Sequence, residues 1–283
     1  MSTDADEQRA RSAEMWEEAA AGWAQRQDGM RAFAAPVSHW LIEAIEPQPG
    51  QRLLELAAGI GETGFLAAEL VRPGGTLISS DRSEGMLEAA KGRAAELGLD
   101  NVEFKVIDAE WIDLPVASVD AVLCRWGYML MADPGAALRE TRRVVKPDGH
   151  LALAVWAAPA ENPWLSLPTA LLIERGAMAP PAPDTPGPFA LSDPDALREL
   201  LEEAGLQDVV VDAVDLVQRH PTFEDYWQTH LDLGRAVHDA IMSQPEEEIE
   251  RIRAELRPRL EAYAGADGAL AVPGRTLVAS ARA

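Results

Sequence analysis

Three glycines and two glutamates in residues 53–64 have the types and spacing most suggestive of chemistry. The segment reads Leu-Leu-Glu-Leu-Ala-Ala-Gly-Ile-Gly-Glu-Thr-Gly: an apolar run ending at Glu55, then a small-residue turn with Gly59, Gly61 and Gly64. An alanine-rich helical stretch follows. A strand, a glycine turn and a helix in this order are typical of a nucleotide-binding unit, because glycines let a ligand approach the backbone at a helix N-terminus.

The two glutamates indicate which nucleotide would suit this turn. The three glycines match the spacing that holds a dinucleotide pyrophosphate. However, Glu55 closes the strand and Glu62 lies inside the turn, where both would repel a pyrophosphate across a short distance. S-adenosylmethionine fits better, because it has an adenosine without phosphate and carries a sulfonium and an ammonium. We therefore expect S-adenosylmethionine rather than NAD as the cofactor.

Acidic residues also end the next two predicted strands. Asp81 follows the second strand, about 20 residues past the glycine turn, where a carboxylate accepts hydrogen bonds from both ribose hydroxyls. A dehydrogenase would use Asp81 in the same way. Asp108 and Glu110 follow the third strand, where an acid accepts a hydrogen bond from the adenine amine and the Ala109 amide serves the neighbouring ring nitrogen. Strand-end acids in this order favour adenosine without phosphate.

Composition narrows the range of partners. The chain has 283 residues, 47% of them hydrophobic, and a net charge of −22. No basic stripe is present to neutralise phosphates, so we expect neither nucleic acid nor a membrane as a partner. The one cysteine, Cys124, excludes a cysteine-rich metal site, and we expect no metal. The polar N-terminus and the lack of an apolar run of ~20 residues predict a cytoplasmic protein.

Strands and helices alternate regularly after the glycine turn. We expect strands at 76–80, 102–107, 118–124 and 150–156, with helices at 83–97 and 135–145. A helix opened by Ser192-Asp-Pro-Asp195, a strand over 208–218 and a final strand over 275–281 complete the pattern. The alternation predicts an α/β fold with a Rossmann-like, mostly parallel sheet and helices on both faces.

The flanking regions have helical apolar spacing and must pack on this core. A break in the leading helices is expected near Asp28 or Pro36. The predicted parts are an N-terminal helical lid (1–46), the cofactor-binding core (47–157), an insertion or lid (158–192), a core helix and strand (193–220), a helical insertion capping the substrate (221–266), and a C-terminal core strand (267–283).

Five segments, taken in order, carry a family resemblance. They are Leu53–Gly64, Ser80–Met86, Asn101–Glu110, Ser118–Cys124 and Arg142–Gly149. Together they resemble the class I S-adenosylmethionine-dependent methyltransferases, in the group that includes the ubiquinone and menaquinone biosynthesis enzymes. The resemblance covers residues 50–157 well and the flanks loosely. It implies seven strands in the family's order, the last one antiparallel, and lid segments over the active site.

The resemblance also implies roles for single residues. Those on the methionine side of the cofactor would be Glu55, Ala57, Gly59 and Gly61, with Cys124, Arg125 and Trp126 meeting the amino-acid end. Asp81 would hold the ribose, Arg82 and Met86 would pack near the adenine, and Asp108, Ala109 and Glu110 would read its edge. Ala57 departs from the family, which usually has its first glycine there, so we expect a slightly less open turn that still binds.

The sequence gives weaker signals for the residues that would bind the methyl acceptor or act as a catalytic base. Methyl transfer is an in-line displacement, so positioning and exclusion of water supply much of the acceleration, and a base is optional. Candidate bases are Tyr128, His220 and His230, although a structural role is an alternative for each histidine. Aromatic residues that would line an acceptor pocket, or equally pack in a core, are Trp16, Trp23, Trp126, Trp156, Trp164, Tyr226 and Trp227.

The predicted function is therefore methyl transfer from S-adenosylmethionine to an oxygen or carbon, with nitrogen as a further option, of a hydrophobic or aromatic small molecule, giving S-adenosylhomocysteine. The chain would act as a monomer or homodimer. Three alternatives stay open: a peptide or protein methyltransferase, a cofactor-binding partner subunit without catalysis, and an NAD-dependent oxidoreductase.

Overall fold

A seven-stranded sheet forms the centre of the computed structural model, which describes residues 3–182 and 185–283. The strand order is β3-β2-β1-β4-β5-β7-β6. β7 runs antiparallel to both of its neighbours, and the other neighbouring pairs are parallel. The strands are β1 (Arg52–Glu55), β2 (Thr76–Asp81), β3 (Val102–Val106), β4 (Val119–Arg125), β5 (Val145–Trp156), β6 (Gln207–His220) and β7 (Leu270–Arg282). The Rossmann-like α/β fold is confirmed.

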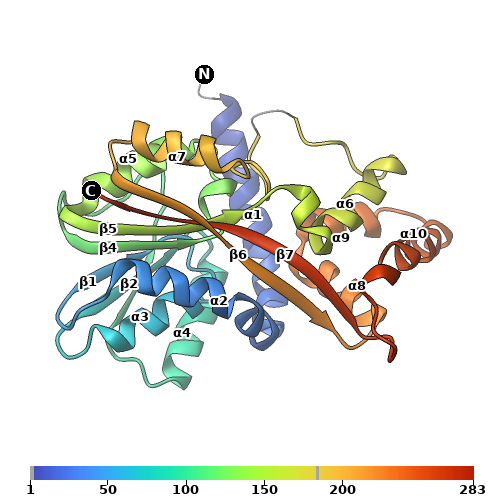
Figure 1. The fold of residues 1–283 in the computed structure, drawn as a ribbon, viewed down its shortest axis with the longest axis horizontal. Helices are drawn as coiled ribbons and strands as arrows, with labels where there is room; N and C mark the ends of the chain where they lie inside the picture. The colour runs from blue at the N-terminus through green and yellow to red at the C-terminus, as the bar shows by residue number, and fades with distance from the viewer. Residues whose placement is uncertain (1–2, 183–184) are drawn as a thin grey trace.

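Helices cover both faces of this sheet (Figure 1). In that view α5 and α7 lie above it, and α2, α3 and α4 lie below it. Covered on both sides, the central strands are almost continuously apolar, as in Leu151–Trp156. The helices are α1 (Thr3–Gln25), α2 (Gln27–Ile45), α3 (Glu62–Leu70), α4 (Glu84–Glu96), α5 (Pro134–Val144), α6 (Pro163–Glu174), α7 (Pro194–Glu203), α8 (Phe223–Leu233), α9 (Arg235–Met242) and α10 (Glu246–Arg259).

β6 and β7 are longer than the other strands and extend past the carboxyl end of β5. Trp156, the last residue of β5, pairs with Thr276 of β7, whereas β7 begins at Leu270. The projecting part pairs with β6 as far as His220. Helices α6, α8, α9 and α10 gather around this projecting arm (Figure 1), and we call these four helices the cap. No helix in residues 3–182 and 185–283 is long and apolar enough to cross a bilayer.

Local sequence signals explain several helix starts. Ser83 accepts a hydrogen bond from the Met86 amide and caps α4, and Asp133 caps α5 through the Ala136 amide. Gly61 precedes α3 with φ 88°, a left-handed conformation that glycine adopts without steric cost. Because the Ser83 and Asp133 side chains bond the amides in the first turns of α4 and α5, the loops that precede the two helices are held in fixed positions.

The break in the leading helices expected near Asp28 is confirmed, and the alternative position at Pro36 is wrong. The helices separate at Arg26, and Pro36 lies inside α2. Pro36 removes a hydrogen bond to the carbonyl of Ala32, but both residues are exposed, so water can satisfy that carbonyl.

The last strand is longer than expected, because Leu270–Gly274 pair with β6 beyond the rest of the sheet. Residues 183 and 184 of the predicted insertion 158–192 lie outside the described residues.

Candidate functional site

The carboxyl ends of β1, β2 and β4 meet at the point where the sheet changes direction. From β1 the chain continues through β2 to β3 at one edge of the sheet, and it then crosses to β4 on the other side of β1 and continues to β5. Ligands of open α/β sheets bind at such a switch point. The residues ending these strands are Glu55, Asp81 and Arg125. The topology therefore brings together three side chains that the sequence separates.

Glu55 is almost fully buried beneath the glycine turn. It is 2% exposed, and its Oε1 accepts a hydrogen bond from the Gly64 amide at 2.8 Å. Burial raises the pKa of Glu55 to about 8, although the Gly64 amide and the charge of Arg125 lower it. Its Oε2 is buried without a hydrogen-bond partner among the described residues. Glu55 thus stabilises the turn through its Oε1, and its Oε2 is available to accept a hydrogen bond from a ligand.

Asp81 and the acids after β3 contact the protein backbone. Asp81 accepts hydrogen bonds from the Gly59 amide at 2.8 Å and the Ser83 amide at 3.0 Å. Burial raises the pKa of Asp81, although these amides lower it. Glu110 accepts from the Ala132 amide at 2.9 Å, and Asp108 accepts from the amide of Glu110 at 3.0 Å. The predicted adenosine residues therefore frame one region around the glycine turn.

Helix α1 lies over this region. Ala19 and Ala20 pack with Ile60 of the turn and Met86 of α4, with Trp16 and Trp23 against the same cluster. Glu17 accepts from the Ser83 hydroxyl at 2.7 Å and the Gly85 amide at 3.0 Å. Further along, Arg9 pairs with Glu110 at 2.6 Å, and Arg82 donates to the Arg9 carbonyl at 3.1 Å. The leading helix thus covers the residues predicted to hold adenosine.

A pocket of about 280 Å³ opens between α2 and α3, next to this region. Its walls include Arg125 and Glu62, together with Arg31, Ser38, His39 and Leu66. Arg125 reaches it from the end of β4, and its Nη1 is buried with no hydrogen-bond partner in the part of the chain described. Burial lowers the pKa of Arg125, while Glu55 and Glu62 raise it. A buried guanidinium with an open donor is suited to binding a carboxylate.

Two non-glycine residues beside the pocket have left-handed backbones. They are Ala57, with φ 49°, and Trp126, with φ 61°. The turns that contain them touch: a Cβ on Gly127 would lie 2.6 Å from both the Ala57 Cβ and the Cys124 Sγ. Strained backbone of this kind persists where the surroundings impose it, and it concentrates at functional sites. Next to Trp126, Arg125 lines the pocket, and its guanidinium lies over the Trp126 ring, 4.8 Å from the ring centroid.

Trp126 enters a group of four rings, the aromatic cluster: Phe33, Trp126, Trp156 and Trp164. Trp126 stacks on Trp156 with centroids 4.1 Å apart, and Trp156 meets Trp164 edge-on at 5.1 Å. Phe33 of α2 contacts all three tryptophans at 5.5–6.1 Å. The Trp126 indole donates to Thr276 of β7 at 3.0 Å, which places the cluster on the covered face of the sheet at the base of the projecting arm.

The other predicted acceptor residues lie elsewhere or at the margin. Trp16 and Trp23 contact each other in α1, 5.9 Å apart. Trp227 packs inside the cap, against Phe223 and beneath Arg253. Tyr226 adjoins the cluster, because its hydroxyl donates to the Trp164 carbonyl at 2.8 Å. The structure therefore joins Trp126, Trp156 and Trp164, places Tyr226 at their margin, and separates Trp16, Trp23 and Trp227 from them.

His230 is held between carbonyl groups. Its Nδ1 lies 2.8 Å from the Tyr226 carbonyl oxygen and its Nε2 lies 2.6 Å from that of Trp164. Burial lowers its pKa to about 4, although the two carbonyls raise it. A neutral ring donates to one of these two carbonyl oxygens. Because both nitrogens lie against backbone carbonyls, the contacts favour a structural role for His230 over the predicted role of a base.

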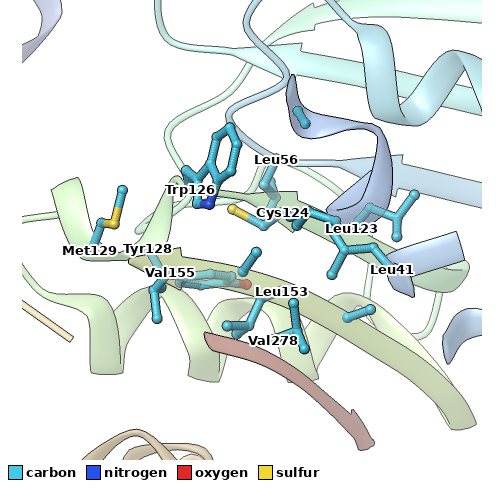
Figure 2. Close-up of a cluster of buried hydrophobic side chains, with 14 of the residues drawn as sticks. Leu41, Leu56, Leu123, Cys124, Trp126, Tyr128, Met129, Leu153, Val155 and Val278 are labelled. Carbon is cyan, nitrogen blue, oxygen red and sulfur yellow. The ribbon is translucent and has the colours of Figure 1, made fainter. Parts of the chain in front are cut away.

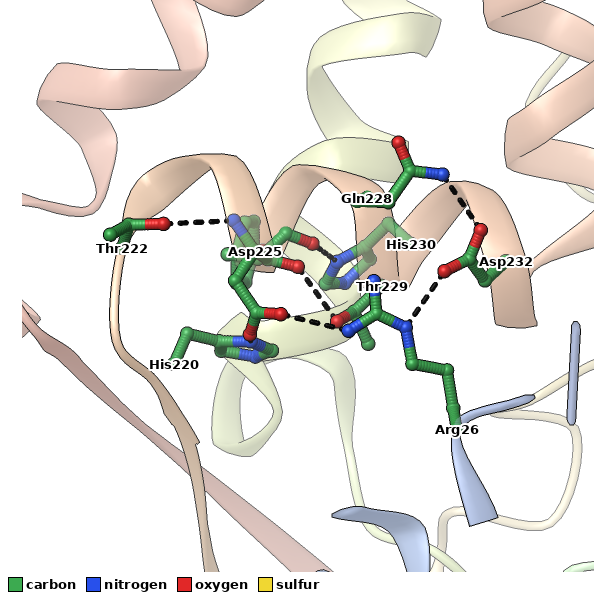
Figure 3. Close-up of polar contacts among 9 residues, drawn as sticks. Arg26, His220, Thr222, Asp225, Gln228, Thr229, His230 and Asp232 are labelled. Atoms are coloured by element: carbon green, nitrogen blue, oxygen red, sulfur yellow. Dashed lines mark hydrogen bonds and ion pairs between the residues drawn. The ribbon is translucent and has the colours of Figure 1, made fainter. Parts of the chain in front are cut away.

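His220 belongs to a polar network between the leading helices and the cap (Figure 3). Its Nδ1 bonds Asp225 at 2.8 Å. Arg26, at the break between α1 and α2, donates to Asp225 at 2.8 Å and to Asp232 at 2.7 Å. Burial lowers the pKa of His220, although Asp225 raises it. Burial alone would raise the pKa of Asp225, but its bonds with His220 and Arg26 lower it. The neutral ring donates Nδ1–H to Asp225, and Nε2 keeps a lone pair.

Tyr128 departs most clearly from its predicted catalytic role. It is 0% exposed, and its hydroxyl lies 2.6 Å from the Thr141 hydroxyl of α5. Figure 2 shows it with Leu153, Val155 and Val278 in the hydrophobic core. Burial raises its pKa well above 10. Cys124 lies in the same core, where burial raises its pKa to about 12, so the thiol supports the turn from beneath.

Several residues of the site are not apparent from the sequence. Phe33, Ser38 and His39 come from α2, and Glu17 comes from α1. In sequence they are ordinary members of helical faces. The only local indication is the polar Ser38 and His39 within an otherwise apolar stretch, and their position opposite Arg125 depends on how α2 packs.

Comparison with known sequences identifies relatives of the core. A family described as a methyltransferase domain matches residues 47–205. Nocamycin O-methyltransferase of Saccharothrix syringae is 31% identical over 201 residues, which are 68% of this chain and 72% of that protein. Demethylmenaquinone methyltransferase of Clavibacter sepedonicus is 38% identical over 116 residues. That match spans 41% of this chain and under half, 45%, of the relative.

Solved structures share the fold. The YcgJ protein of Bacillus subtilis aligns with a TM-score of 0.57 and 18% identity, over 87% of this chain and 97% of that chain. Phosphoethanolamine N-methyltransferase 2 of Haemonchus contortus, solved with S-adenosyl-L-methionine, aligns with a TM-score of 0.53 and 18% identity, over 87% of this chain and 52% of that chain. At these identities the likeness concerns the fold.

Proposed function

The chain belongs to the methyltransferase domain family, as a class I S-adenosylmethionine-dependent enzyme, and from this premise we propose that it methylates an oxygen or carbon of a hydrophobic aromatic small molecule. The predicted family and cofactor are confirmed, and the alternative of an NAD-dependent oxidoreductase is wrong. The acceptor class is proposed from the aromatic cluster, which begins at Trp126, the residue after Arg125.

One observation carries the assignment of the cofactor's orientation: Arg125 lines a pocket beside the glycine turn, and its Nη1 is buried without a hydrogen-bond partner among the described residues. S-adenosylmethionine presents a carboxylate at its amino-acid end, and Arg125 would bind it. Glu62 lines the pocket, where its carboxylate would favour the ammonium, and the unpartnered Oε2 of Glu55 would accept a hydrogen bond from the same group. Asp81 would hold the ribose, and Asp108, Ala109 and Glu110 would lie along the adenine.

Helix α1 and the aromatic cluster would exclude water and position the acceptor. When bound, the cofactor would supply an electrophilic methyl group: a bond would form from the acceptor oxygen or carbon to the methyl carbon as the methyl–sulfur bond breaks, and the acceptor's proton would pass to solvent. We assign α1 as the cover over the adenosine region, since Glu17 attaches it to α4 at Ser83 and Gly85. His230 and Tyr128 are occupied in packing, so binding geometry, rather than either group, would provide the acceleration.

A peptide methyltransferase and a cofactor-binding subunit without catalysis would each differ from this function in an observable way. A peptide acceptor would require an open groove at the aromatic cluster, but Trp126, Trp156 and Trp164 are 5–7% exposed. This burial favours a small acceptor over a peptide. A partner subunit without catalysis would bind the cofactor and release no product.

The orientation is tested by isothermal titration with two ligands. S-adenosylhomocysteine contains the amino-acid group, and 5′-methylthioadenosine lacks it. We expect Arg125→Met to weaken S-adenosylhomocysteine binding by at least 10-fold, the scale of a lost charge-assisted hydrogen bond, and to leave methylthioadenosine binding unchanged. Equal weakening of both ligands, or of neither, would contradict the assignment of Arg125.

Turnover is tested separately. Radiolabelled S-adenosylmethionine is incubated with naphthols, quinols and hydroxyanthraquinones, and labelled product is extracted. We expect transfer to at least one of these classes. Tight cofactor binding without transfer across the panel would instead support a partner subunit without catalysis.

A further inference from the structure

Two buried polar groups lie two residues apart on the arm formed by β6 and β7. Gln218 is 5% exposed and His220 is 4% exposed, whereas Val217, beside Gln218, is 44% exposed. Alternate residues of a strand share a face, so both side chains point to the covered side, as Leu216 does. The Gln218 Oε1 and the His220 Nε2 are buried without a hydrogen-bond partner among the residues described.

The same face carries the aromatic cluster. Val214 of β6 pairs with Thr276, the residue that accepts the Trp126 indole bond. Farther out, Gln218 pairs with Val272 and His220 pairs with Leu270. Directly paired residues share a face of the sheet, so one continuous surface runs from the cluster to Gln218 and His220.

Rings continue along this surface from the cluster to His220. Trp164 lies 6.1 Å from His230, which lies 4.2 Å from Tyr226. Tyr226 meets His220 edge-on at 5.2 Å. Buried polar atoms are normally satisfied, so open acceptors at the end of an aromatic surface indicate a missing donor.

The position of the proton on His220 determines whether the missing ligand group must donate or accept a hydrogen bond. The carboxylate of Asp225 accepts Nδ1–H and fixes the ring, and Arg26 holds the carboxylate from the other side. The Nε2 therefore presents a lone pair, and the Gln218 oxygen presents another. A ligand that satisfies both must donate two hydrogen bonds.

We propose that Gln218 and His220 bind two hydroxyl or N–H donors on the end of the acceptor remote from the cofactor, an inference that rests on the proposed function. From Thr276 to Leu270 the strand advances six residues, about 20 Å at 3.3 Å per residue. His220 is thus a specificity-determining residue rather than the base at the methylated atom. The acceptor would be an elongated aromatic molecule with donors at its far end.

The test uses protein loaded with S-adenosylhomocysteine and two probes of the same skeleton. These are 2,3-dihydroxyanthraquinone, which carries two neighbouring hydroxyl donors at one end, and 2,3-dimethoxyanthraquinone, which carries no donor there. We expect the wild type to prefer the dihydroxy probe by at least 10-fold. Gln218→Met removes one acceptor, and His220→Asn retains a donor toward Asp225 while removing Nε2. Each should reduce the preference about fivefold, as for one neutral hydrogen bond.

Matched controls come from two residues of the cap, the exposed Gln228 and the half-buried His238. Gln228→Met and His238→Asn change the same residue types, and His238 also pairs with an aspartate, Asp239. Both controls should keep the preference of the wild type. All four variants should bind S-adenosylhomocysteine as tightly as the wild type, which shows that they are folded.

A second measurement needs no variant. The ¹⁵N resonance of the His220 Nε2 should shift when the dihydroxy probe is added to loaded wild-type protein, and should stay unchanged with the dimethoxy probe. Equal affinity for the two probes, binding of neither, or an unchanged preference in both variants would overturn the inference. Failure of the wild type to bind S-adenosylhomocysteine would contradict the proposed function instead.

Discussion

The Oδ2 of Asp81 accepts a hydrogen bond from the backbone amide of Gly59 at 2.8 Å. This bond connects the acid at the end of β2 to the glycine turn after β1, 22 residues earlier. The Ser83 amide bonds the other carboxylate oxygen at 3.0 Å. Asp81 therefore stabilises the shape of the turn as well as offering lone pairs to a ribose.

Replacing Asp81 should weaken cofactor binding. Asp81→Asn keeps the size of the side chain and one carbonyl acceptor but removes the charge. We expect the affinity for S-adenosylhomocysteine to fall by about 1.5–3 kcal/mol, the scale of hydrogen bonds to a charged group. Calorimetric titration measures the change. Unchanged affinity would mean that Asp81 does not contact the cofactor.

Asp120 is the matched control for this change. It accepts from the Arg52 amide at 2.8 Å and from Lys146 at 2.7 Å, so it too joins a strand to its neighbour. It lies near the start of β4, at the opposite end of the sheet from the site. Asp120→Asn should lower the melting temperature and leave the affinity unchanged.

The left-handed Ala57 predicts a substitution that stabilises the fold. An L-residue at φ 49° has a steric cost that glycine avoids. Part of that gain is offset by the greater chain entropy of unfolded glycine, so Ala57→Gly should stabilise by about 0.5–1 kcal/mol. Urea unfolding measures the difference. Destabilisation would show that the Ala57 methyl contributes more by packing than its backbone costs.

Ala117 provides the comparison for Ala57. It has φ 52° and is exposed in a loop away from the site. Ala117→Gly should give a similar stabilisation. Neither variant should alter the affinity for S-adenosylhomocysteine by more than about threefold, which is less than 1 kcal/mol.

The sequence predicts features that depend on local chemistry. The Ser83 cap, the strand-end position of Asp81 and the turn at Gly61 each depend on a few neighbouring residues. The arrangement of the aromatic residues depends on long-range packing. Phe33 reaches Trp126 because α2 crosses the same sheet face, and no local pattern encodes that crossing.

Tyr128 shows the limit of arguing from position in the chain. It lies in the loop after β4, where a side chain faces either the ligand edge or the core. The preceding left-handed residue, Trp126, changes the direction of the chain, and Tyr128 points toward Thr141 of α5. A sequence pattern does not reveal a positive φ at a tryptophan.

Glu55 should make stability fall as the pH rises. Burial raises its pKa in the folded state to about 8 from an ordinary value of 4.5. Between these values the folded state binds more protons than the unfolded state, so the free energy of unfolding decreases with pH. From pH 5 to pH 8 the loss should be about 3 kcal/mol. Urea unfolding of the wild type and Glu55→Gln measures it.

Glu55→Gln mimics the protonated carboxyl group and should remove most of that pH dependence. Glu88→Gln, which changes an exposed glutamate on α4, should retain it. If the free energy of unfolding changed with pH in the same way for the wild type and Glu55→Gln, Glu55 would have the same pKa in the folded and unfolded states.

Helix α1 should control the exchange of the cofactor through Glu17. The Glu17 carboxylate accepts hydrogen bonds from Ser83 and Gly85, which fastens α1 to the start of α4. These bonds and the N-terminus of α4 lower the pKa of Glu17, so it is ionised at neutral pH. Glu17→Ala removes the fastening while leaving the residues predicted to contact the cofactor intact. Losing about 1 kcal/mol of closure energy should speed dissociation of S-adenosylhomocysteine about fivefold in stopped-flow displacement.

Glu7→Ala separates this effect from a general loosening of the helix. Glu7 lies on α1 as well, and its carboxylate pairs with Arg11 one turn away. Removing it changes the charge of the helix by the same amount without touching α4, so dissociation should keep the wild-type rate. If both variants released the ligand equally fast, helix stability rather than the Glu17 contact would set the rate. If neither did, α1 would not cover the path by which the cofactor leaves.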